Sequence, residues 1–363
     1  MSLANTSQSY GSAARLLHWL TAMGILIMIP LGWIAHRLPY DTESQLALKA
    51  QLFSAHKTLG IAVLAVALVR IAWALSQPKP APLHPERRAE TLLAETVHWL
   101  LYGSLILVPL SGWIEHAATA GFAPIWWPFG QSLPFVPKSP ALAETFATLH
   151  FLLQWVLTAS VLLHVAGAVK HALIDRDSTL ARMSRGTSAG QPGKTHSLRP
   201  LIAALAVWIA VLGSAAATGL FATAATPVSA NLEATDSDWQ VETGSIALSL
   251  QQMGAEVTGS FADWSADISF EPQDTPGKSG EVRVHIAIPS LTLGSVTKQA
   301  LGADFFNAEG FPVAIFEADS LSAADGYTAD GTLSLKGQTV PVSLPFSLHL
   351  EGDRAEMRVT TTL

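Results

Sequence analysis

The stretch ETFATLHFLLQWVLTASVLLHVAGAVK, residues 144–170, has a charged residue at each end and none between them. A helix of this kind can cross the hydrocarbon core of a membrane, which needs about 20 apolar residues. Its two histidines, His150 and His164, lie fourteen residues apart, an interval over which an α-helix advances about 21 Å and returns to nearly the same face. Imidazole is a good ligand for haem iron, and a polar group held at membrane depth is costly. The stretch therefore predicts one membrane helix with ligand candidates at two depths.

Composition separates a membrane part from a soluble part. Charged residues make up 13% of the 363 residues, against about 25% in ordinary soluble domains. Residues 1–225 contain 15 Lys and Arg and 9 Asp and Glu, whereas residues 226–363 contain 6 and 19. The first part is predicted to lie in a membrane and the second to be a soluble acidic domain. Cysteine is absent, which excludes disulfides, iron–sulfur clusters and covalent haem attachment. We expect no nucleic-acid partner.

Five apolar stretches are long enough to cross the bilayer, at residues 16–34, 52–75, 96–114, 145–173 and 201–221. Lys and Arg are concentrated in the segment after the fourth stretch, which predicts that this side is cytoplasmic. Counting back along the spans, we expect a cytoplasmic N-terminus. Counting forward, the fifth span would carry everything after about residue 225 out of the cytoplasm.

This topology places four histidines at two levels. His56 and His150 fall near the outer ends of the second and fourth spans, and His18 and His164 fall near the inner ends of the first and fourth. Each level then has two imidazoles from different helices. A haem with two histidine ligands requires such a pair.

Three further residues belong to the inner level or its edge. Arg70 follows His56 by the same fourteen residues, so its cation could pair with haem propionates there. Residues 98–116 repeat the spacing of residues 18–36, with a Trp fifteen and a His eighteen residues after the first His. His98 is therefore also at the inner level, and spacing leaves open whether His18 or His98 is the partner of His164. His171, near the inner interface, is equally compatible with a solvated face and with a quinone contact.

The motifs Arg15-Leu16-Leu17-His18-Trp19, Ala55-His56-Lys57-Thr58-Leu59-Gly60, Val69-Arg70, His98-Trp99-Leu100-Leu101-Tyr102, Leu149-His150 and Leu163-His164 together resemble the bacterial cytochrome b561 family. The resemblance covers residues 8–185. Members are four-helix proteins with two haem b groups that exchange electrons with membrane quinone, and one branch oxidises superoxide. Carried over by position, the resemblance implies His18, His56, His150 and His164 as the haem-iron ligands. It thus favours His18 over His98, which spacing did not.

The second part of the chain changes from helical to strand periodicity. Residues 340–350 and 282–288 alternate apolar and polar side chains, which is typical of an antiparallel sandwich or barrel. His285 and His349 fall on the polar faces and are predicted to be solvated. Residues 226–237 are expected to be a linker, preceded by a cytoplasmic linker and the fifth helix in residues 186–225.

Residues 259–265, 303–312 and 331–337 resemble the YceI-like family, over about residues 238–363. Its members are periplasmic lipocalin-like barrels that enclose an isoprenoid chain, in some cases a quinone-type lipid. Family barrels continue for further strands beyond the position of Leu363, so we expect a barrel that is truncated or open at one edge. Four aromatic residues are candidates for lining a lipid pocket: Phe261, Trp264, Phe305 and Phe306. Ordinary packing in the core of the barrel is an equally good explanation for them.

The expected fold is therefore a membrane four-helix di-haem bundle with a fifth transmembrane helix, followed by an all-β lipocalin-like antiparallel barrel. The expected function is electron transfer between the membrane quinone pool and a periplasmic donor or acceptor, with superoxide among the donors. The tethered barrel would bind ubiquinone or another isoprenoid lipid. The alternative is a periplasmic lipid-binding protein for which the helices are an anchor. Metal transport is disfavoured because carboxylates are nearly absent from the spans.

Overall fold

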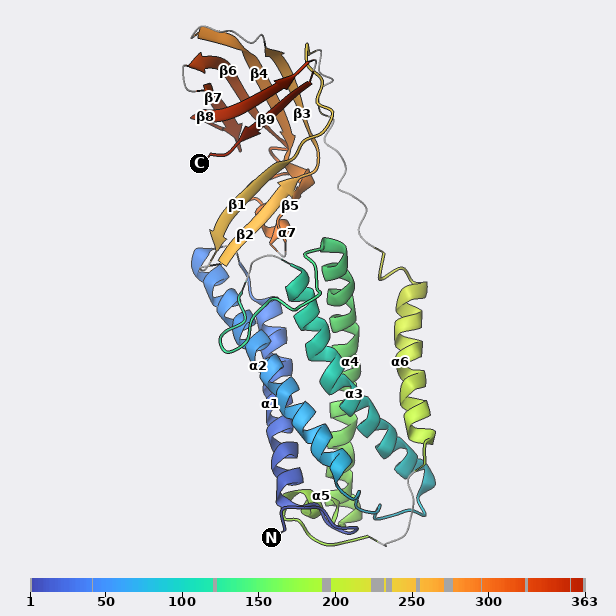
Figure 1. Ribbon diagram of the computed structural model, residues 1–363. Coiled ribbons are helices and arrows are strands. Elements are labelled where there is room, and N and C mark those ends of the chain that lie inside the picture. Colours follow the sequence, from blue (N-terminus) through green and yellow to red (C-terminus); the bar gives the residue numbers. More distant parts are fainter. Residues whose placement is uncertain are drawn as a thin grey trace. The chain divides into compact units, whose positions relative to one another are not determined.

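The computed structural model describes residues 2–40, 42–119, 123–190, 197–222, 232, 237–252, 255–270, 277–294, 296–323, 326–352 and 354–361. Most of the predicted linker at 226–237 lies outside these residues. The chain divides into a helical unit and a β unit, with the boundary after Thr223 (Figure 1).

The helical unit contains the predicted spans. Within the described residues, five helices are long and apolar enough to cross a membrane by length and composition, which confirms the five-span prediction. Their bounds are α1 Ser12–Arg37, α2 Glu43–Ser76, α3 Arg88–Ala118, α4 Pro140–Lys170 and α6 Arg199–Ala217. Between α4 and α6 lie a short π-helix, His171–Asp175, and the six-residue α5, Thr179–Ser184.

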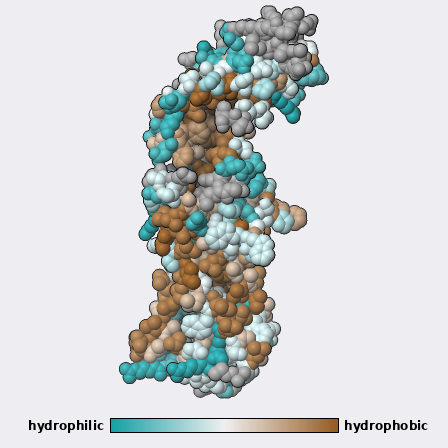
Figure 2. Space-filling model, turned by 90° about the vertical axis from the view of Figure 1, so that its left-hand side faces the viewer, coloured by the Kyte–Doolittle hydropathy of each residue, from teal (hydrophilic) through white to brown (hydrophobic). Residues whose placement is uncertain are grey.

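Local sequence signals fix where the spans begin. Thr42 and Gln45 form a reciprocal capping box at the start of α2, and the Ser139 side chain caps α4 ahead of Pro140. Both arrangements satisfy backbone donors that a helix N-terminus leaves unpaired. Only 11–33% of the apolar window of each span is buried, and apolar side chains gather on the outside of the helices (Figure 2). Such a surface requires lipid rather than water around it.

The fifth span packs onto the other helices through one large side chain. A Cβ added at Gly103 of α3 would lie 1.6 Å from the Trp208 ring of α6. The absent side chain therefore makes the notch that the indole fills. Leu100, Val156 and Ala204 are buried beside it. Within the helical unit, α6 is thus a packed element and not a loose tether.

The β unit is built from two antiparallel sheets. One has the order β1-β2-β5, with bounds Ile246–Gln252, Ala255–Phe261 and Leu291–Thr292. The other has the order β3-β4-β6-β7-β8-β9, with bounds Trp264–Phe270, Gly277–Ala287, Val313–Ala323, Gly326–Leu335, Gln338–Glu351 and Arg354–Val359. Among the described strands, β3 and β9 are the edges of the larger sheet, each paired on one side only. The unit is therefore a half-barrel open at one side, which confirms the predicted lipocalin-type fold.

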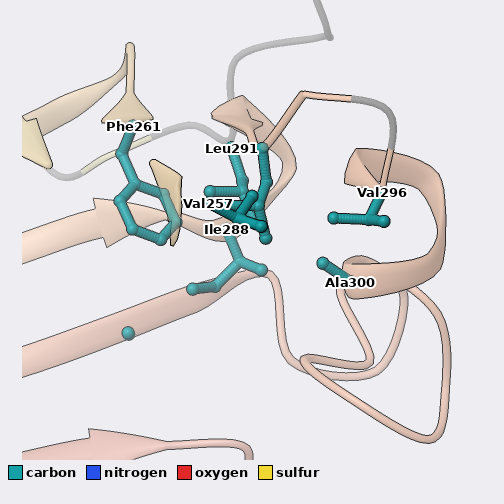
Figure 3. Packing of buried hydrophobic residues seen from close by; sticks show 8 residues of the cluster. Val257, Phe261, Ile288, Leu291, Val296 and Ala300 are labelled. Carbon is teal, nitrogen blue, oxygen red and sulfur yellow. The ribbon is translucent and has the colours of Figure 1, made fainter. Parts of the chain in front are cut away.

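Two apolar clusters fill this unit. The first joins β2 to the segment after β4 and to the short helix α7, Thr297–Ala300; Val257, Ile288 and Leu291 are almost fully buried there (Figure 3). The second consists of side chains from strands β4, β6, β7 and β8 of the larger sheet, with Phe316 and Ala329 buried in it.

The two histidines of the β unit have different environments. The side chain of His349 is 74% exposed, so the prediction of a solvated residue is confirmed. For His285 the prediction is wrong, because only 9% of the residue is exposed. It lies on β4 between two neighbouring strands, directly opposite Ser265 and Ile315, and periodicity alone could not show that this part of the polar face is covered.

Candidate functional site

Four predicted histidines meet in pairs inside the helical unit. At one level His56 of α2 faces His150 of α4, with ring centroids 6.4 Å apart and ring planes at 84°. At the other level His18 of α1 faces His164 of α4, at 6.1 Å and 60°. The first pair lies toward the start of α4 and the second toward its end, so the two levels are separated along the bundle as the fourteen-residue spacing predicts.

The separations can be compared with what one metal ion between two imidazoles requires. With metal–nitrogen bonds of about 2.0 Å, two rings on opposite sides of one ion have centroids roughly 6.3 Å apart. The observed 6.4 and 6.1 Å match this value. The donor set is also that of a b-type haem, since bis-histidine ligation needs no other protein ligand. The residues present therefore fit two such groups.

His98 belongs to the inner level but is placed differently. Its ring centroid lies 5.1 Å from that of His164, more than 1 Å below the separation of roughly 6.3 Å that an intervening ion requires. The two rings meet edge to face, at 75°. His98 thus packs against His164 as a neighbour, whereas His18 stands at a ligand's distance.

Two glycines allow the helices to approach the outer pair. A Cβ at Gly32 of α1 would lie 2.7 Å from Cε1 of His56, and one at Gly112 of α3 would lie 3.0 Å from Nδ1 of His150. Both glycines come from the repeated segment noted in the sequence, Pro30-Leu31-Gly32-Trp33 and Pro109-Leu110-Ser111-Gly112-Trp113. The glycine of each repeat therefore leaves space for one outer imidazole. The repeat is present in the sequence, but only the positions of the two rings show that its glycines face the histidines.

A hydrogen bond sets the tautomer of His150. Its Nδ1 lies 2.9 Å from the carbonyl oxygen of Val108, which can only accept, so Nδ1 carries the proton. Nε2 then keeps its lone pair for a metal. Such an outer hydrogen bond commonly orients a ligating imidazole and fixes its tautomer.

The predicted cation is present at the inner level. Nη2 of Arg70 lies 3.2 Å from Nδ1 of His18, and the guanidinium lies over the Tyr102 ring at 5.3 Å. Arginine can only donate, so Nδ1 accepts in this arrangement. Ligation through Nε2 would move the ring proton to Nδ1 and release the guanidinium for an acidic partner such as a propionate.

His171 lies in a charged cluster at the inner end of the bundle. Its Nδ1 is 2.6 Å from Oδ2 of Asp177 and its Nε2 is 3.2 Å from Oε1 of Glu90. His84, in the loop before α3, reaches the same Asp177 oxygen at 3.0 Å. Burial raises the pKa of Asp177, but hydrogen bonds from Thr179, His171 and His84 outweigh burial and hold this pKa below its ordinary value. Sequence reasoning missed His84 and Asp177, because nothing in a loop sequence shows that it folds back onto His171.

The four aromatic candidates of the β unit do not form one site. Phe261 and Phe306 pack edge to face, with centroids 6.4 Å apart, in the first apolar cluster. Phe305 is 47% exposed, and Trp264 lies against Gly244, where a Cβ would be 2.6 Å from its ring. A row of half-buried apolar side chains, which could contact a lipid, lies on β8 at Val342, Leu344 and Phe346.

A bundle of membrane-length helices with paired internal imidazoles, joined to an antiparallel half-barrel, defines an integral membrane protein of the b-type cytochrome class. The chain belongs to the prokaryotic cytochrome b561 family, whose model matches residues 9–186. That family implies haem b. Residues 233–363 match the model of the YceI-like domain.

Two relatives cover the helical unit. Cytochrome b561 homolog 2 of Escherichia coli strain K12 is 31% identical over 188 residues, 50% of this chain and 95% of the relative. A Yersinia pestis protein named "Probable superoxide oxidase CybB" is 28% identical over 169 residues, 46% of this chain and 90% of the relative.

The β unit has relatives of its own. A UPF0312 protein of Yersinia pestis strain Pestoides F is 29% identical over 96 residues, 26% of this chain, so the match spans 50% of that relative's length. Among solved structures, Burkholderia cenocepacia BcnA is 28% identical with a TM-score of 0.29, covering 31% of this chain and 72% of that one.

Proposed function

We propose that this protein is a di-haem b cytochrome that transfers electrons between membrane quinone and a donor or acceptor on the periplasmic side. The observation that carries the proposal is the pair of imidazole–imidazole separations, 6.4 and 6.1 Å, at two levels of one bundle. His56 and His150 would hold the outer haem, and His18 and His164 the inner one. Bound haem b would supply a reversible one-electron couple at each level.

The protein's own residues would favour electron transfer at each haem without making or breaking a bond to the iron. Two imidazoles per iron leave no open position, which favours outer-sphere transfer over oxygen binding. Between the levels, Ile25, Ala67 and Leu105 form a buried apolar cluster that excludes water. Arg70 would neutralise propionate charge at the inner level, and His98 would hold the His164 ring in orientation.

Quinone exchange is assigned to the inner end of the bundle. Reduction of a quinone consumes protons as well as electrons, and imidazoles paired with carboxylates can deliver them. His171 is such a group, seven residues beyond His164 and between Glu90 and Asp177. Of the two roles that the sequence left open for His171, a solvated face and a quinone contact, this geometry favours the quinone contact.

The proposed orientation follows from loop charge. The cationic segment after α4 would lie in the cytoplasm and the chain after α6 in the periplasm of a bacterial inner membrane. A redox partner would then meet the level of His56 and His150. A relative of the helical unit is named a probable superoxide oxidase, which makes superoxide the first donor to test.

The β unit would hold an isoprenoid lipid, with quinone as one candidate. Support comes from the apolar cluster on its larger sheet, around Phe316 and Ala329, and from the half-buried row on β8. Tethering would raise the local concentration of that lipid near the outer level without any new contact.

The test of the proposed function is a reduced-minus-oxidised absorption spectrum of the purified full chain. We expect a b-type haem band that is partly lost in His150→Ala and retained in His36→Ala, the matched histidine at the end of α1. Absence of the band, or a band unchanged in His150→Ala, would contradict the proposal.

The second candidate function is lipid carriage, with the helices as an anchor. The apolar cluster on the larger sheet of the half-barrel favours it. It predicts that mass spectrometry of extracts finds a bound isoprenoid that Phe346→Asp removes and His56→Ala leaves in place. If Phe346→Asp retains the lipid, this cluster is not its site.

A further inference from the structure

The cluster at the inner end of the helical unit, where His171 is proposed to deliver protons, also brings a second imidazole, that of His84, to the same carboxylate. Nε2 of His84 and Nδ1 of His171 approach the same oxygen, Oδ2 of Asp177, at 3.0 and 2.6 Å. The two imidazole planes are parallel to within 1°, with centroids 6.3 Å apart. The nitrogens of two imidazoles therefore both lie against one carboxylate oxygen, and the three side chains come from two segments that are distant in the sequence.

A break in helical geometry produces this convergence. At His171 the chain leaves α4 and enters a π-helix that runs to Asp175, and Arg176 then turns it back with a left-handed backbone, φ 53°. The wider turn brings Oδ2 of Asp175 to 3.2 Å from Nδ1 of His171. Single π-turns are rare and occur frequently at functional sites.

The carboxylates of this cluster differ in their partners: Glu90 and Asp175 form ion pairs with lysine or arginine, whereas Asp177 contacts histidines. Lys170 lies 2.8 Å from Glu90 and 2.7 Å from Asp175, and Arg87 lies 3.2 Å from Asp175. In the described part of the chain, no Lys or Arg forms an ion pair with Asp177, whose side chain is only 13% exposed. Within the described residues, this carboxylate is contacted by the two imidazoles and by the backbone N–H of Thr179, without a permanently charged partner.

From this arrangement we infer a binding site for a divalent first-row transition metal ion at His84, His171 and Asp177. Two imidazoles and one carboxylate are a frequent donor set for such ions, with further positions left for water or a nearby carboxylate. Asp175 and Glu90 stand next to His171 with donor atoms within 4.8 Å of one another. The site rests on side-chain geometry and does not depend on the proposed electron transfer. An occupied site would withdraw His171 from proton delivery.

The test uses Zn²⁺ as the probe on the full chain in detergent. Chelator-treated protein is loaded with Zn²⁺, desalted, and analysed by elemental mass spectrometry. We expect about one tightly held zinc per chain, and a loss of at least about tenfold in affinity for His84→Ala and Asp177→Asn. His349→Ala, which removes an exposed histidine of the β unit, is the matched control and should bind as the wild type does. Size-exclusion profiles and thermal melting identify any variant that has lost its fold.

A second readout separates metal binding from protonation. Because protons compete with the ion for the imidazole nitrogens, zinc affinity should weaken as the pH falls from about 7.5 to 5.5. Repeating the zinc titration across this pH range measures the change. Wild-type protein that binds no more zinc than His84→Ala, or whose zinc affinity does not change with pH, would overturn the inference.

Discussion

The close approach of α1 to the outer imidazole leads to a sharp prediction for Gly32→Ala. The new Cβ would lie 2.7 Å from Cε1 of His56, whereas ordinary contact begins at 3.4 Å. The ring or the helix must therefore move by at least about 0.7 Å, the difference of these distances, in a packed interior where overpacking costs about 1–3 kcal/mol. At 1.4 kcal/mol per factor of ten, this cost corresponds to about 5- to 150-fold weaker haem binding at the outer level.

Haem titration into apoprotein, followed by absorbance, measures this loss, and electron paramagnetic resonance reports the altered ring geometry of any haem that stays bound. Gly112→Ala should have a smaller effect, because its Cβ would start 3.0 Å from Nδ1 of His150. Gly167→Ala is the control, since no atom lies within 4 Å of the added Cβ. Unchanged haem binding in Gly32→Ala, or an equal loss in Gly167→Ala, would show that the close approach of Gly32 to His56 is not needed for haem binding.

Three further predictions concern other parts of the helical unit. Arg70→Leu removes a cation from the inner level and should lower the midpoint potential of that couple by on the order of tens of mV, with Arg70→Lys restoring most of it; equal potentials in a redox titration would contradict this. Trp208→Ala empties the Gly103 notch and should cost about 3 kcal/mol in thermal unfolding, whereas the neighbouring Ile209, 72% exposed, should tolerate alanine. Because the folded pKa of Asp177 is depressed, its stabilisation is present above about pH 4 and is lost as the pH falls through the folded pKa. Asp177→Asn should therefore melt earlier than wild type at neutral pH and converge with it in acid, and a pH-independent difference would argue against a charged role.

The general plan of the fold could be predicted because it depends on patterns with a physical period. Apolar length gives the spans, and the period of two gives the strands. Spacing also placed His56, His150, His18 and His164 at two levels, since rise per residue is a constant of the helix. Rotation of one helix relative to another is not determined by spacing, so spacing left the choice between His18 and His98 open, and only the family resemblance implied His18. In the structure their ring centroids lie 6.1 and 5.1 Å from that of His164.

The features that sequence reasoning missed depend on contacts between distant segments. His84 and Asp177 are separated by 93 residues and meet only because a loop and a π-turn fold together. Burial of His285 depends on the strands at both sides of β4. Packing of α6 depends on an indole that fits a missing side chain. None of these leaves a periodic signal in the chain.

A potentiometric titration of purified protein can determine whether each of the two imidazole pairs holds one haem b. We expect two one-electron components in the wild type, loss of one in His150→Ala, loss of the other in His18→Ala, and retention of both in His98→Ala. A single component in the wild type, or loss of a component in His98→Ala with none in His18→Ala, would contradict the assignment.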